Sequence, residues 1–260
     1  MIAFFLMSAA LAAPVTVTSV YDGDTFTLSD GSKIRLAAVN TPELRPAESY
    51  AVEARNAAEA FMKGAQVELD PNPPQDSYGR IISQAYVDGE SLSEHLVSLG
   101  LAHVFLIPPI PENHDIAALL SAQQSAREAN RGIWSTDRYR GELHITSFHA
   151  NAAGDDRENV NGEYLRLCNI TSLELNVEGY WISDASGGKW MFPAVTIPAG
   201  HTLKVHSGKG TNATDPREQL AIYLGNDRPI WNNRQDRATI YDRYGRISDV
   251  RVHESLSAGE

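Results

Sequence analysis

The sequence predicts a mainly β protein of two domains, a small β barrel with about three helices followed by a β-sandwich. Three observations support this fold class. A chain of 260 residues has the length of one or two domains. Up to residue 88, short β-branched runs are separated by Asp-Gly turns, and helical patterns lie between and after them. Beyond residue 141 only short alternating runs remain, with turn residues about every ten positions.

The composition is that of a globular protein. Apolar residues make up 42% and charged residues 21% of the chain, which excludes a disordered chain, a collagen-like fibre and a membrane protein with several spans. The single cysteine, Cys168, cannot form a disulfide within the chain. With 22 basic and 33 acidic residues, the net charge is −11. Binding of nucleic acid would therefore require a small local positive site rather than a broad basic surface.

The beginning of the chain resembles an export signal. Met1 to Ala13 form a short apolar run that ends in small residues, as in a signal peptide cleaved before Ala13. The run is too short to cross a bilayer, which takes about 20 residues. It carries no Lys or Arg, so a misassigned start codon and a first strand remain alternatives. A signal peptide over residues 1–12 predicts a secreted or cell-surface protein, and residues 255–260 are expected to form a frayed tail.

Strands dominate the start of the first domain. Three β-branched runs are separated by Asp22-Gly23 and Asp30-Gly31, and such dipeptides suit tight hairpin turns because glycine tolerates a positive φ angle. The expected strands are Val15–Val20, Thr25–Leu28, Lys33–Val39, Gln66–Asp70 and Arg80–Val87.

Three helices are predicted in the same domain. Helical spacing of apolar residues covers Ser49–Lys63. Ser91 and Glu94 form a capping box that opens a short helix, and Gly100 closes it. The third helix is expected from about Asp115 to Asn130.

Two carboxylates flank a glycine at Asp22 and Asp24. Carboxylate oxygens are the ligands that a hard cation such as Ca²⁺ prefers. The same dipeptide is also the commonest hairpin turn, and a second copy at Asp88-Gly89 suggests no chemistry. Taken alone, the motif is explained by a turn.

Two further segments carry residues suited to phosphate chemistry. Arg35 precedes a loop in which Glu43 could act as a general base on water. Arg80 opens a strand after a glycine turn, and arginine suits bidentate contact with phosphate. Taken singly, solvated arginines and polar turns explain both segments.

In combination, the motifs occur in the order and spacing of a known family. They are Val20-Tyr-Asp-Gly-Asp-Thr25, Ile34-Arg-Leu36, Thr41-Pro-Glu43, Tyr50 with Glu53-Ala54, Tyr78-Gly-Arg80, Tyr86-Val-Asp-Gly89, Leu99-Gly-Leu-Ala102 and Gly132-Ile-Trp-Ser135. The first domain, assigned to residues 13–138, resembles staphylococcal-type thermonuclease. The resemblance implies an OB-fold barrel with helices that cleaves DNA and RNA with Ca²⁺, to 3′-phosphate ends and with low sequence specificity.

The resemblance also implies a metal site. Asp24 would be a carboxylate ligand, and the carbonyl of Thr41 would be a backbone ligand. The family's second carboxylate ligand falls on Asn40, whose amide oxygen can still ligate Ca²⁺. Loss of one negative charge is expected to weaken binding or to change the preferred divalent ion.

The implied catalytic groups are Glu43, Arg35 and Arg80. Glu43 would activate or orient the attacking water, and the two arginines would brace the phosphoryl group as its charge grows. Tyr78 would contact the substrate. The tyrosines that follow the Gly-Leu-Ala motif in the family are replaced around Phe105 and Ile107, so base stacking there is expected to be reduced.

The second domain, assigned to residues 139–254, resembles a lamin-tail domain, which is an immunoglobulin-like β-sandwich. The residues that carry this resemblance are Asn161-Gly-Glu-Tyr164, Leu167 with Asn169, Gly179-Tyr-Trp-Ile-Ser-Asp184, Phe192-Pro193, Ile197-Pro-Ala-Gly200, His206-Ser-Gly208, Trp231-Asn-Asn233 and Tyr241-Asp242 with Gly245. No catalytic role is expected for this domain. Attachment to a cell surface or to a protein partner is a hypothesis that follows from its being a separate module.

Three functions are therefore open from the sequence. The first is an exported, metal-dependent nuclease with DNA and RNA as substrates. The second is an OB module that binds nucleic acid without cleaving it, which the loss of a carboxylate at Asn40 would favour. The third is a structural surface protein in which the sandwich is the working part. Retention of Glu43, Arg35 and Arg80 favours the nuclease, since a binding module needs no general base.

Overall fold

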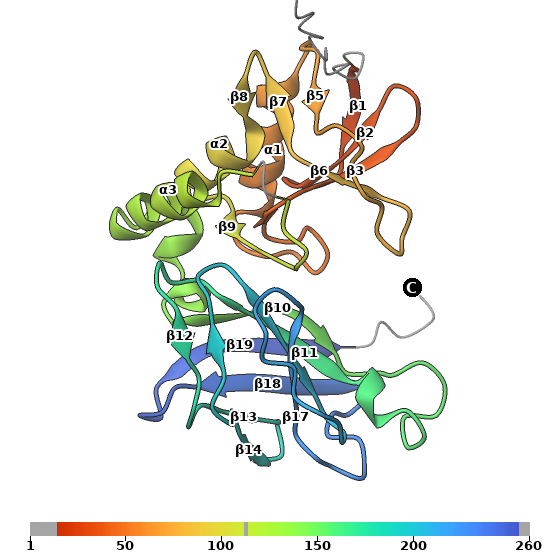
Figure 1. Cartoon of the computed structure of the whole chain (residues 1–260), viewed down its shortest axis with the longest axis vertical. Helices are drawn as coiled ribbons and strands as arrows, with labels where there is room; N and C mark the ends of the chain where they lie inside the picture. Colours follow the sequence, from red (N-terminus) through yellow and green to blue (C-terminus); the bar gives the residue numbers. More distant parts are fainter. Residues whose placement is uncertain (1–14, 112–113, 255–260) are drawn as a thin grey trace, which may run out of the picture. The chain divides into compact units, whose positions relative to one another are not determined.

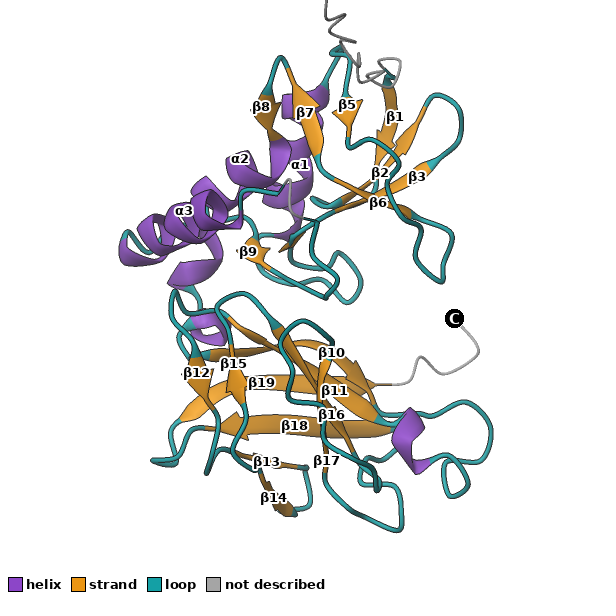
Figure 2. Cartoon of the chain, viewed as in Figure 1, coloured by secondary structure: helices purple, strands orange, loops and turns teal. Residues whose placement is uncertain are grey.

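A computed structural model describes residues 15–111 and 114–254. The predicted signal peptide, residues 1–12, and the predicted tail, residues 255–260, lie outside the described residues. The chain divides into two compact units. Unit 1 comprises Met1–Ala37 and Thr41–Leu96, and unit 2 comprises Ala38–Asn40 and Val97–Glu260. Strands outnumber helices among the residues that the structure describes, as the predicted mainly β class requires, and Figure 2 shows both kinds of element.

Unit 1 contains a four-stranded sheet with the order β1-β2-β3-β6 (Figure 1). β1 to β3 are antiparallel, and β6 runs parallel to β3. Buried and partly exposed side chains alternate along β2 and β3, the period that a half-buried strand imposes. The strands are β1 (Val17–Val20), β2 (Thr25–Leu28), β3 (Lys33–Leu36) and β6 (Ile81–Ser83).

A second sheet of unit 1 has the order β5-β7-β8, with β5 (Glu68–Leu69), β7 (Ala85–Val87) and β8 (Glu90–Ser91). β6 and β7 are the two halves of the strand predicted over Arg80–Val87. An antiparallel bridge also joins Val15 to Val67. These two links connect the sheets in the manner of an OB-type barrel, although the hydrogen-bonded ladders of the described residues remain two separate sheets.

The prediction of one continuous strand over Lys33–Val39 is wrong in one respect, because the strand is interrupted at Ala38. This residue has a φ angle of 64°, so the chain turns there and side chains stop alternating. The adjacent residues Leu36 and Ala37 are both buried as a result. The short strand β4 (Val39–Asn40) pairs instead with β9 (His103–Val104) in unit 2. An alanine carries no sequence signal for a left-handed backbone, so the pattern continued through it.

The three predicted helices are present as α1 (Ala51–Met62), α2 (Leu92–Ser98) and α3 (Ile116–Glu128). α1 buries an alanine-rich stripe at helical spacing. The serine half of the predicted capping box is present at the start of α2, since the Oγ atom of Ser91 accepts a hydrogen bond from the N–H of Glu94 at 3.3 Å. Across the described part of the chain, no helix combines the length and apolar character needed to cross a membrane.

Unit 2 contains the predicted sandwich (Figure 2). One sheet has the order β10-β11-β16-β17 and the other the order β14-β13-β18-β19. Their inner faces share a core of buried aliphatic and aromatic side chains that includes Leu143, Leu167, Ile182 and Trp231. The strands are β10 (Leu143–His149), β11 (Tyr164–Asn169), β16 (Thr202–His206), β17 (Leu220–Tyr223), β13 (Trp181–Ser183), β14 (Lys189–Met191), β18 (Gln235–Tyr241) and β19 (Ile247–Glu254). A two-stranded sheet, β12 (Leu175–Asn176) with β15 (Thr196–Ile197), and 3₁₀ turns at Gly132–Ser135, Asp137–Tyr139 and Val160–Gly162 complete the described elements.

Unit 2 also includes β9 and α3, which lie before the sandwich in the sequence. The N–H of Leu106 donates to the carbonyl of Gly200 at 2.8 Å. The side chain of Gln123 in α3 accepts from the N–H of Val104 at 2.7 Å and donates to the carbonyl of Ile170 at 3.2 Å. Because these groups are buried, the bonds fix the end of the first sequence domain to the sandwich.

Candidate active site

The turn between β1 and β2 is built around Gly23. A Cβ atom on this residue would lie 2.6 Å from Cγ2 of Thr41 and 2.9 Å from Cβ of Ala54 in α1, so the close approach requires glycine. The turn therefore packs tightly against the Thr41 segment and α1. It places Asp22 and Asp24 inside the unit, each only 5% exposed.

The carboxylate of Asp24 joins three elements. Its Oδ2 atom accepts a hydrogen bond from the N–H of Thr41 at 2.8 Å. Its Oδ1 atom accepts from Oγ1 of Thr25 at 3.1 Å and lies 3.3 Å from Nε of Arg35 in β3. The structure thus brings together three of the residues predicted from the sequence, Asp24, Arg35 and Thr41.

Asp22 belongs to the same cluster and was not among the predicted site residues. Its Oδ1 atom accepts a hydrogen bond from the N–H of Asp24 at 3.2 Å. Burial and the nearby charges of Asp24 and Glu43 raise the pKa of Asp22 to about 7, although Arg35 and a hydrogen bond with Thr25 oppose the shift. The signal in the sequence was the pair of aspartates around one glycine, which a plain hairpin turn also explains.

Glu43 lies in a loop that is closed by local hydrogen bonds. Its N–H donates to Oε2 of Glu48 at 2.9 Å, and the N–H of Glu48 donates back to the carbonyl of Glu43 at 2.9 Å. The side chain is half-buried, and its charge acts on Asp22. Glu43 is therefore near the Asp22 and Asp24 cluster, as a group that handles water beside a phosphate must be.

Arg80 is engaged elsewhere. Its Nε atom donates to Oδ2 of Asp76 at 2.8 Å, and its guanidinium lies 5.6 Å from the ring centre of Tyr78. In the part of the chain that the structure describes, the Arg80 side chain contacts these two residues and not Asp24 or Glu43. The ring of Tyr78 is 84% exposed. Arg80 immediately precedes β6, which runs beside the strand that carries Arg35.

Asn40 is a residue of β4, opposite His103 of β9 in unit 2. Its side chain is half-buried. Thr41 follows it directly in the sequence and provides the N–H that Asp24 accepts. The carbonyl and amide oxygens of these two residues are the neutral donors in the predicted ligand set.

The donor chemistry of unit 1 fits a hard cation. Asp22, Asp24 and Glu43 supply carboxylates near the guanidinium of Arg35, and repulsion by Asp24 and Glu43 adds to burial in raising the pKa of Asp22. A divalent cation would relieve this repulsion. Among residues 15–111 and 114–254, no three His, Cys, Asp or Glu side chains converge as a ligand set, so a metal here would also need neutral oxygens.

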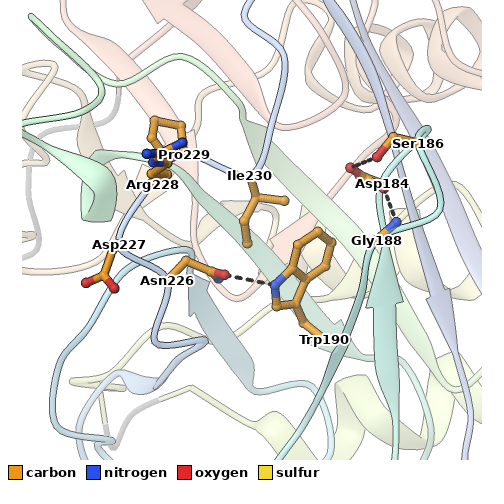
Figure 3. Close-up of a pocket in the computed structure, with 9 residues that line it drawn as sticks. All are labelled: Asp184, Ser186, Gly188, Trp190, Asn226, Asp227, Arg228, Pro229 and Ile230. Atoms are coloured by element: carbon orange, nitrogen blue, oxygen red, sulfur yellow. Dashed lines mark hydrogen bonds between the residues drawn. The ribbon is translucent and has the colours of Figure 1, made fainter.

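A surface pocket is present in unit 2 and contains none of the predicted site residues (Figure 3). Oδ2 of Asp184 accepts from Oγ of Ser186, and its Oδ1 accepts from the N–H of Gly188, both at 2.6 Å. Nε1 of Trp190 donates to Oδ1 of Asn226 at 3.1 Å. These polar groups stabilise the loops around the pocket. The lining residues are Asp184, Ser186, Gly188, Trp190, Asn226, Asp227, Arg228, Pro229 and Ile230.

Comparison with known proteins agrees with this architecture. Residues 33–136 match the family described as staphylococcal nuclease homologue, and residues 136–255 match the family described as Lamin Tail Domain. The first match begins after the Asp22 and Asp24 turn.

Curated relatives are similar over about half of the chain. Endonuclease YncB of Bacillus subtilis (strain 168) is 31% identical over 134 residues, which are 48% of this chain and 63% of the relative. The SPbeta prophage-derived endonuclease YokF of the same organism is 29% identical over 134 residues, 48% of this chain and 45% of the relative. An uncharacterized protein of Bacillus anthracis is 29% identical over 131 residues, 46% of this chain and 59% of the relative. The match thus covers less than two thirds of each relative.

Both sequence resemblances are confirmed at the level of domains: the chain carries a staphylococcal nuclease homologue domain followed by a lamin tail domain.

Proposed function

We propose that this chain is a divalent-metal-dependent nuclease that hydrolyses phosphodiester bonds of DNA and RNA with low sequence specificity. The observation that carries the proposal is the meeting of Asp24, Arg35 and Thr41 in one buried cluster, with Asp22 and Glu43 beside it. The relatives named as endonucleases support the same class of reaction.

The chemistry of the cluster suits in-line displacement at phosphorus. Glu43 takes the proton of a water whose oxygen bonds to phosphorus, while the bond from phosphorus to the 5′ oxygen breaks and that oxygen receives a proton. This direction of cleavage leaves a 3′-phosphate end. Arg35, held in place by Asp24, donates to the phosphoryl oxygens as their negative charge grows.

A divalent cation, when bound, supplies further positive charge at the phosphoryl group. The residues proposed to hold it are Asp24, the amide oxygen of Asn40 and the carbonyl of Thr41. Ca²⁺ suits this set because it accepts carboxylate, amide and backbone oxygens together. Because the amide of Asn40 is neutral, the site could prefer another divalent ion, and the assay must therefore include other divalent ions.

Export and attachment complete the proposal. The apolar run of residues 1–12 supports secretion or display at the cell surface. The lamin tail domain is proposed to hold the enzyme near a surface or a protein partner.

An activity assay tests the proposal. The protein without residues 1–12 is incubated with single-stranded DNA, double-stranded DNA and RNA, with Ca²⁺, with other divalent ions and with a chelator. Glu43→Gln is expected to lower turnover by about 100-fold or more, the usual contribution of a general base. Glu59→Gln is the matched control, since it makes the same change at an exposed glutamate of α1. Equal turnover in the wild type and Glu43→Gln would remove Glu43 from the mechanism.

A second function is nucleic-acid binding without cleavage. Two observations favour it: Asn40 replaces a carboxylate ligand, and Arg80 is paired with Asp76. Tight binding of an oligonucleotide in millimolar Ca²⁺, with no cleavage by any divalent ion, would identify this function.

A further inference from the structure

An exposed tyrosine flanks the candidate active site. Tyr21 directly follows β1 and precedes Asp22 in the sequence, and it is 54% exposed. In the described part of the chain, its ring makes no contact with another aromatic ring and has no cation over either face. A single exposed aromatic residue is common on protein surfaces, so the position of Tyr21 decides what its ring can do.

Tyr21 lies in line with Arg35 across three strands of unit 1. The N–H of Tyr21 donates to the carbonyl of Thr25 at 2.8 Å, which continues the antiparallel register of Val20 with Phe26 in β1 and β2. Thr25 is paired in turn with Arg35 of β3. The three strands lie side by side in Figure 1. Since paired strands are spaced by about 4.8 Å, the backbones of Tyr21 and Arg35 are about 10 Å apart.

This row lies on the outer face of the sheet. Residues directly opposite each other on paired strands point their side chains to the same face, and successive residues alternate between faces. Phe26 and Ile34, which alternate with Thr25 and Arg35, are fully buried and form the inner face. Thr25 and Arg35 keep part of their surface exposed. The ring of Tyr21 is therefore on the same solvent-facing side of the sheet as Arg35.

A second cation follows on this outer face. Lys33 lies two residues before Arg35 in β3, so the two side chains point to the same side, about 7 Å apart along the strand. Lys33 is exposed, and among residues 15–111 and 114–254 no carboxylate forms an ion pair with it. β3 thus presents two cations in series, a spacing that successive phosphates of an extended strand can follow.

The strand between the cations and the ring carries only small side chains on this face. Thr25 is paired with Arg35, and Thr27 is paired with Lys33. A nucleotide with its phosphates along β3 therefore has room to lay its base across β2. The base then points toward the ring of Tyr21 beyond it.

We propose that Tyr21 stacks on a base of the substrate next to the phosphate bound by Arg35, with the following phosphate at Lys33. An exposed aromatic ring beside a row of cations is the combination that binds unpaired nucleotides without reading their sequence. A duplex fits less well, because its bases are already stacked on one another. The ligand is therefore single-stranded DNA or RNA, or a strand end that has opened.

This contact compensates for a loss elsewhere in the chain. Base stacking around Phe105 and Ile107 is expected to be reduced, since the family's tyrosines are replaced there. Tyr21 supplies an aromatic ring from a different strand, next to the aspartate turn. The inference rests on the proposed function, because it takes the enzyme's own substrate as the ligand.

The test is binding in a chelator, where metal-dependent cleavage does not occur. Fluorescence anisotropy measures the affinity of the protein for a labelled single-stranded oligothymidylate. Tyr21→Leu is expected to weaken binding by about fivefold or more, the loss of one stacked base. Tyr21→Phe should bind as tightly as the wild type, because it keeps the ring. Tyr244→Leu is the matched control, since it removes a tyrosine that is 78% exposed in unit 2.

The salt dependence tests the phosphate contact. Lys33→Gln is expected to weaken binding and to reduce the slope of log K against log salt by about 0.7, the loss of one phosphate contact on a single strand. Lys63→Gln is its control, because it removes another exposed lysine at the end of α1. Thermal melting identifies the folded variants, and Lys33→Gln keeps the test decisive if Tyr21→Leu fails to fold.

A kinetic measurement in Ca²⁺ gives a second readout. The stacked base is bound in the ground state and in the transition state alike, so Tyr21→Leu should raise KM more than it lowers kcat on single-stranded DNA. On a duplex of the same length, the effect of Tyr21→Leu should be much smaller. An equal effect on both substrates would overturn the inference.

The remaining outcomes separate this inference from the proposed function. No binding by the wild type, affinity unchanged in Tyr21→Leu and Lys33→Gln, or an equal loss in Tyr244→Leu and Lys63→Gln would overturn the inference. Cleavage by a protein whose affinity and KM do not depend on Tyr21 would contradict the inference alone. Binding that depends on Tyr21 and Lys33, without cleavage in any divalent ion, would contradict the proposed function alone.

Discussion

The Nε atom of Arg35 lies 3.3 Å from Oδ1 of Asp24, and the side chains of both residues are largely withdrawn from solvent. The arginine is therefore held by the same carboxylate that is proposed to ligand the metal. Because Asp24 also accepts a hydrogen bond from the N–H of Thr41, one carboxylate orients both the arginine proposed to bind phosphate and the backbone of Thr41, a proposed metal ligand. Asp24 therefore couples the position of the proposed metal ligands to the position of Arg35.

Replacement of Arg35 should affect turnover more than substrate binding. Arg35→Gln removes a charge that is needed when negative charge develops at phosphorus, and the expected loss in kcat is about 100-fold. Arg35→Lys should recover only part of the rate, because an ammonium group cannot reproduce the planar fork of the guanidinium. Steady-state kinetics on one oligonucleotide measures both variants. Equal rates for Arg35→Gln and the wild type would contradict the role.

Gly23→Ala should destabilise unit 1. The new methyl group would meet Thr41 and Ala54 at distances below 3 Å, and overpacking of this kind costs about 1–3 kcal/mol. The shift of the aspartate turn should also lower activity. Ser29→Ala is a suitable control, because it changes an exposed side chain of the next turn and leaves the glycines in place. Urea unfolding of both variants measures the difference.

The high pKa of Asp22 predicts a dependence of stability on pH. The pKa is raised from 3.8 to about 7 in the folded protein. Between these values the folded chain holds a proton that the unfolded chain has lost, so the free energy of unfolding should fall as pH rises from about 4 to 7. In Asp22→Asn this contribution should disappear, and the variant should gain stability relative to the wild type above pH 7.

Urea unfolding at pH 5 and pH 8 measures this effect, with Asp88→Asn as a control in an exposed aspartate turn. Divalent cations should reduce the fall in the wild type, since a cation favours the ionised carboxylate. An identical pH profile in Asp22→Asn and the wild type would mean that Asp22 titrates in its ordinary range.

The sequence predicted much of this architecture because its signals are local. Hairpin dipeptides, helix caps and alternating runs predicted most strands of the two domains and all three helices. The cluster of Asp24, Arg35 and Thr41 was predicted through the family resemblance, because a turn or a solvated arginine explains each of these residues taken singly. Asp22 was not predicted as a site residue. The reason is that a buried carboxylate and an exposed carboxylate in a turn cannot be told apart in a sequence.

Other features depend on contacts that no local pattern encodes. The break at Ala38 requires a left-handed alanine, which has no sequence signature. The bonds of Gln123 and Leu106 to the sandwich join residues far apart in the chain. The alignment of Tyr21 with Arg35 is evident only once the register of three strands is known, since the two residues are 14 positions apart in the sequence.

The Asp76–Arg80 ion pair predicts an activating substitution. If Arg80 acts on the phosphoryl group, its bond to Asp76 at 2.8 Å must open first. Asp76→Asn removes the competing charge and should raise kcat/KM severalfold, whereas Arg80→Ala should lower it. The double variant should behave like Arg80→Ala, because the gain depends on the arginine. A gain that persists in the double variant would show that Asp76 acts independently of Arg80.

Asn40→Asp should tighten the proposed metal site. The substitution restores a negative charge at a position where the family has a carboxylate, and the affinity of oxygen sites for Ca²⁺ rises with the number of charged ligands. The Ca²⁺ concentration for half-maximal cleavage should therefore fall, with little change in the rate at saturation. Calorimetric titration with Ca²⁺ in the absence of substrate gives an independent measure of the same affinity. Asn130→Asp, at the exposed end of α3, controls for the added charge alone. A rise in rate at saturating Ca²⁺ without a change in affinity would place Asn40 in catalysis rather than in metal binding.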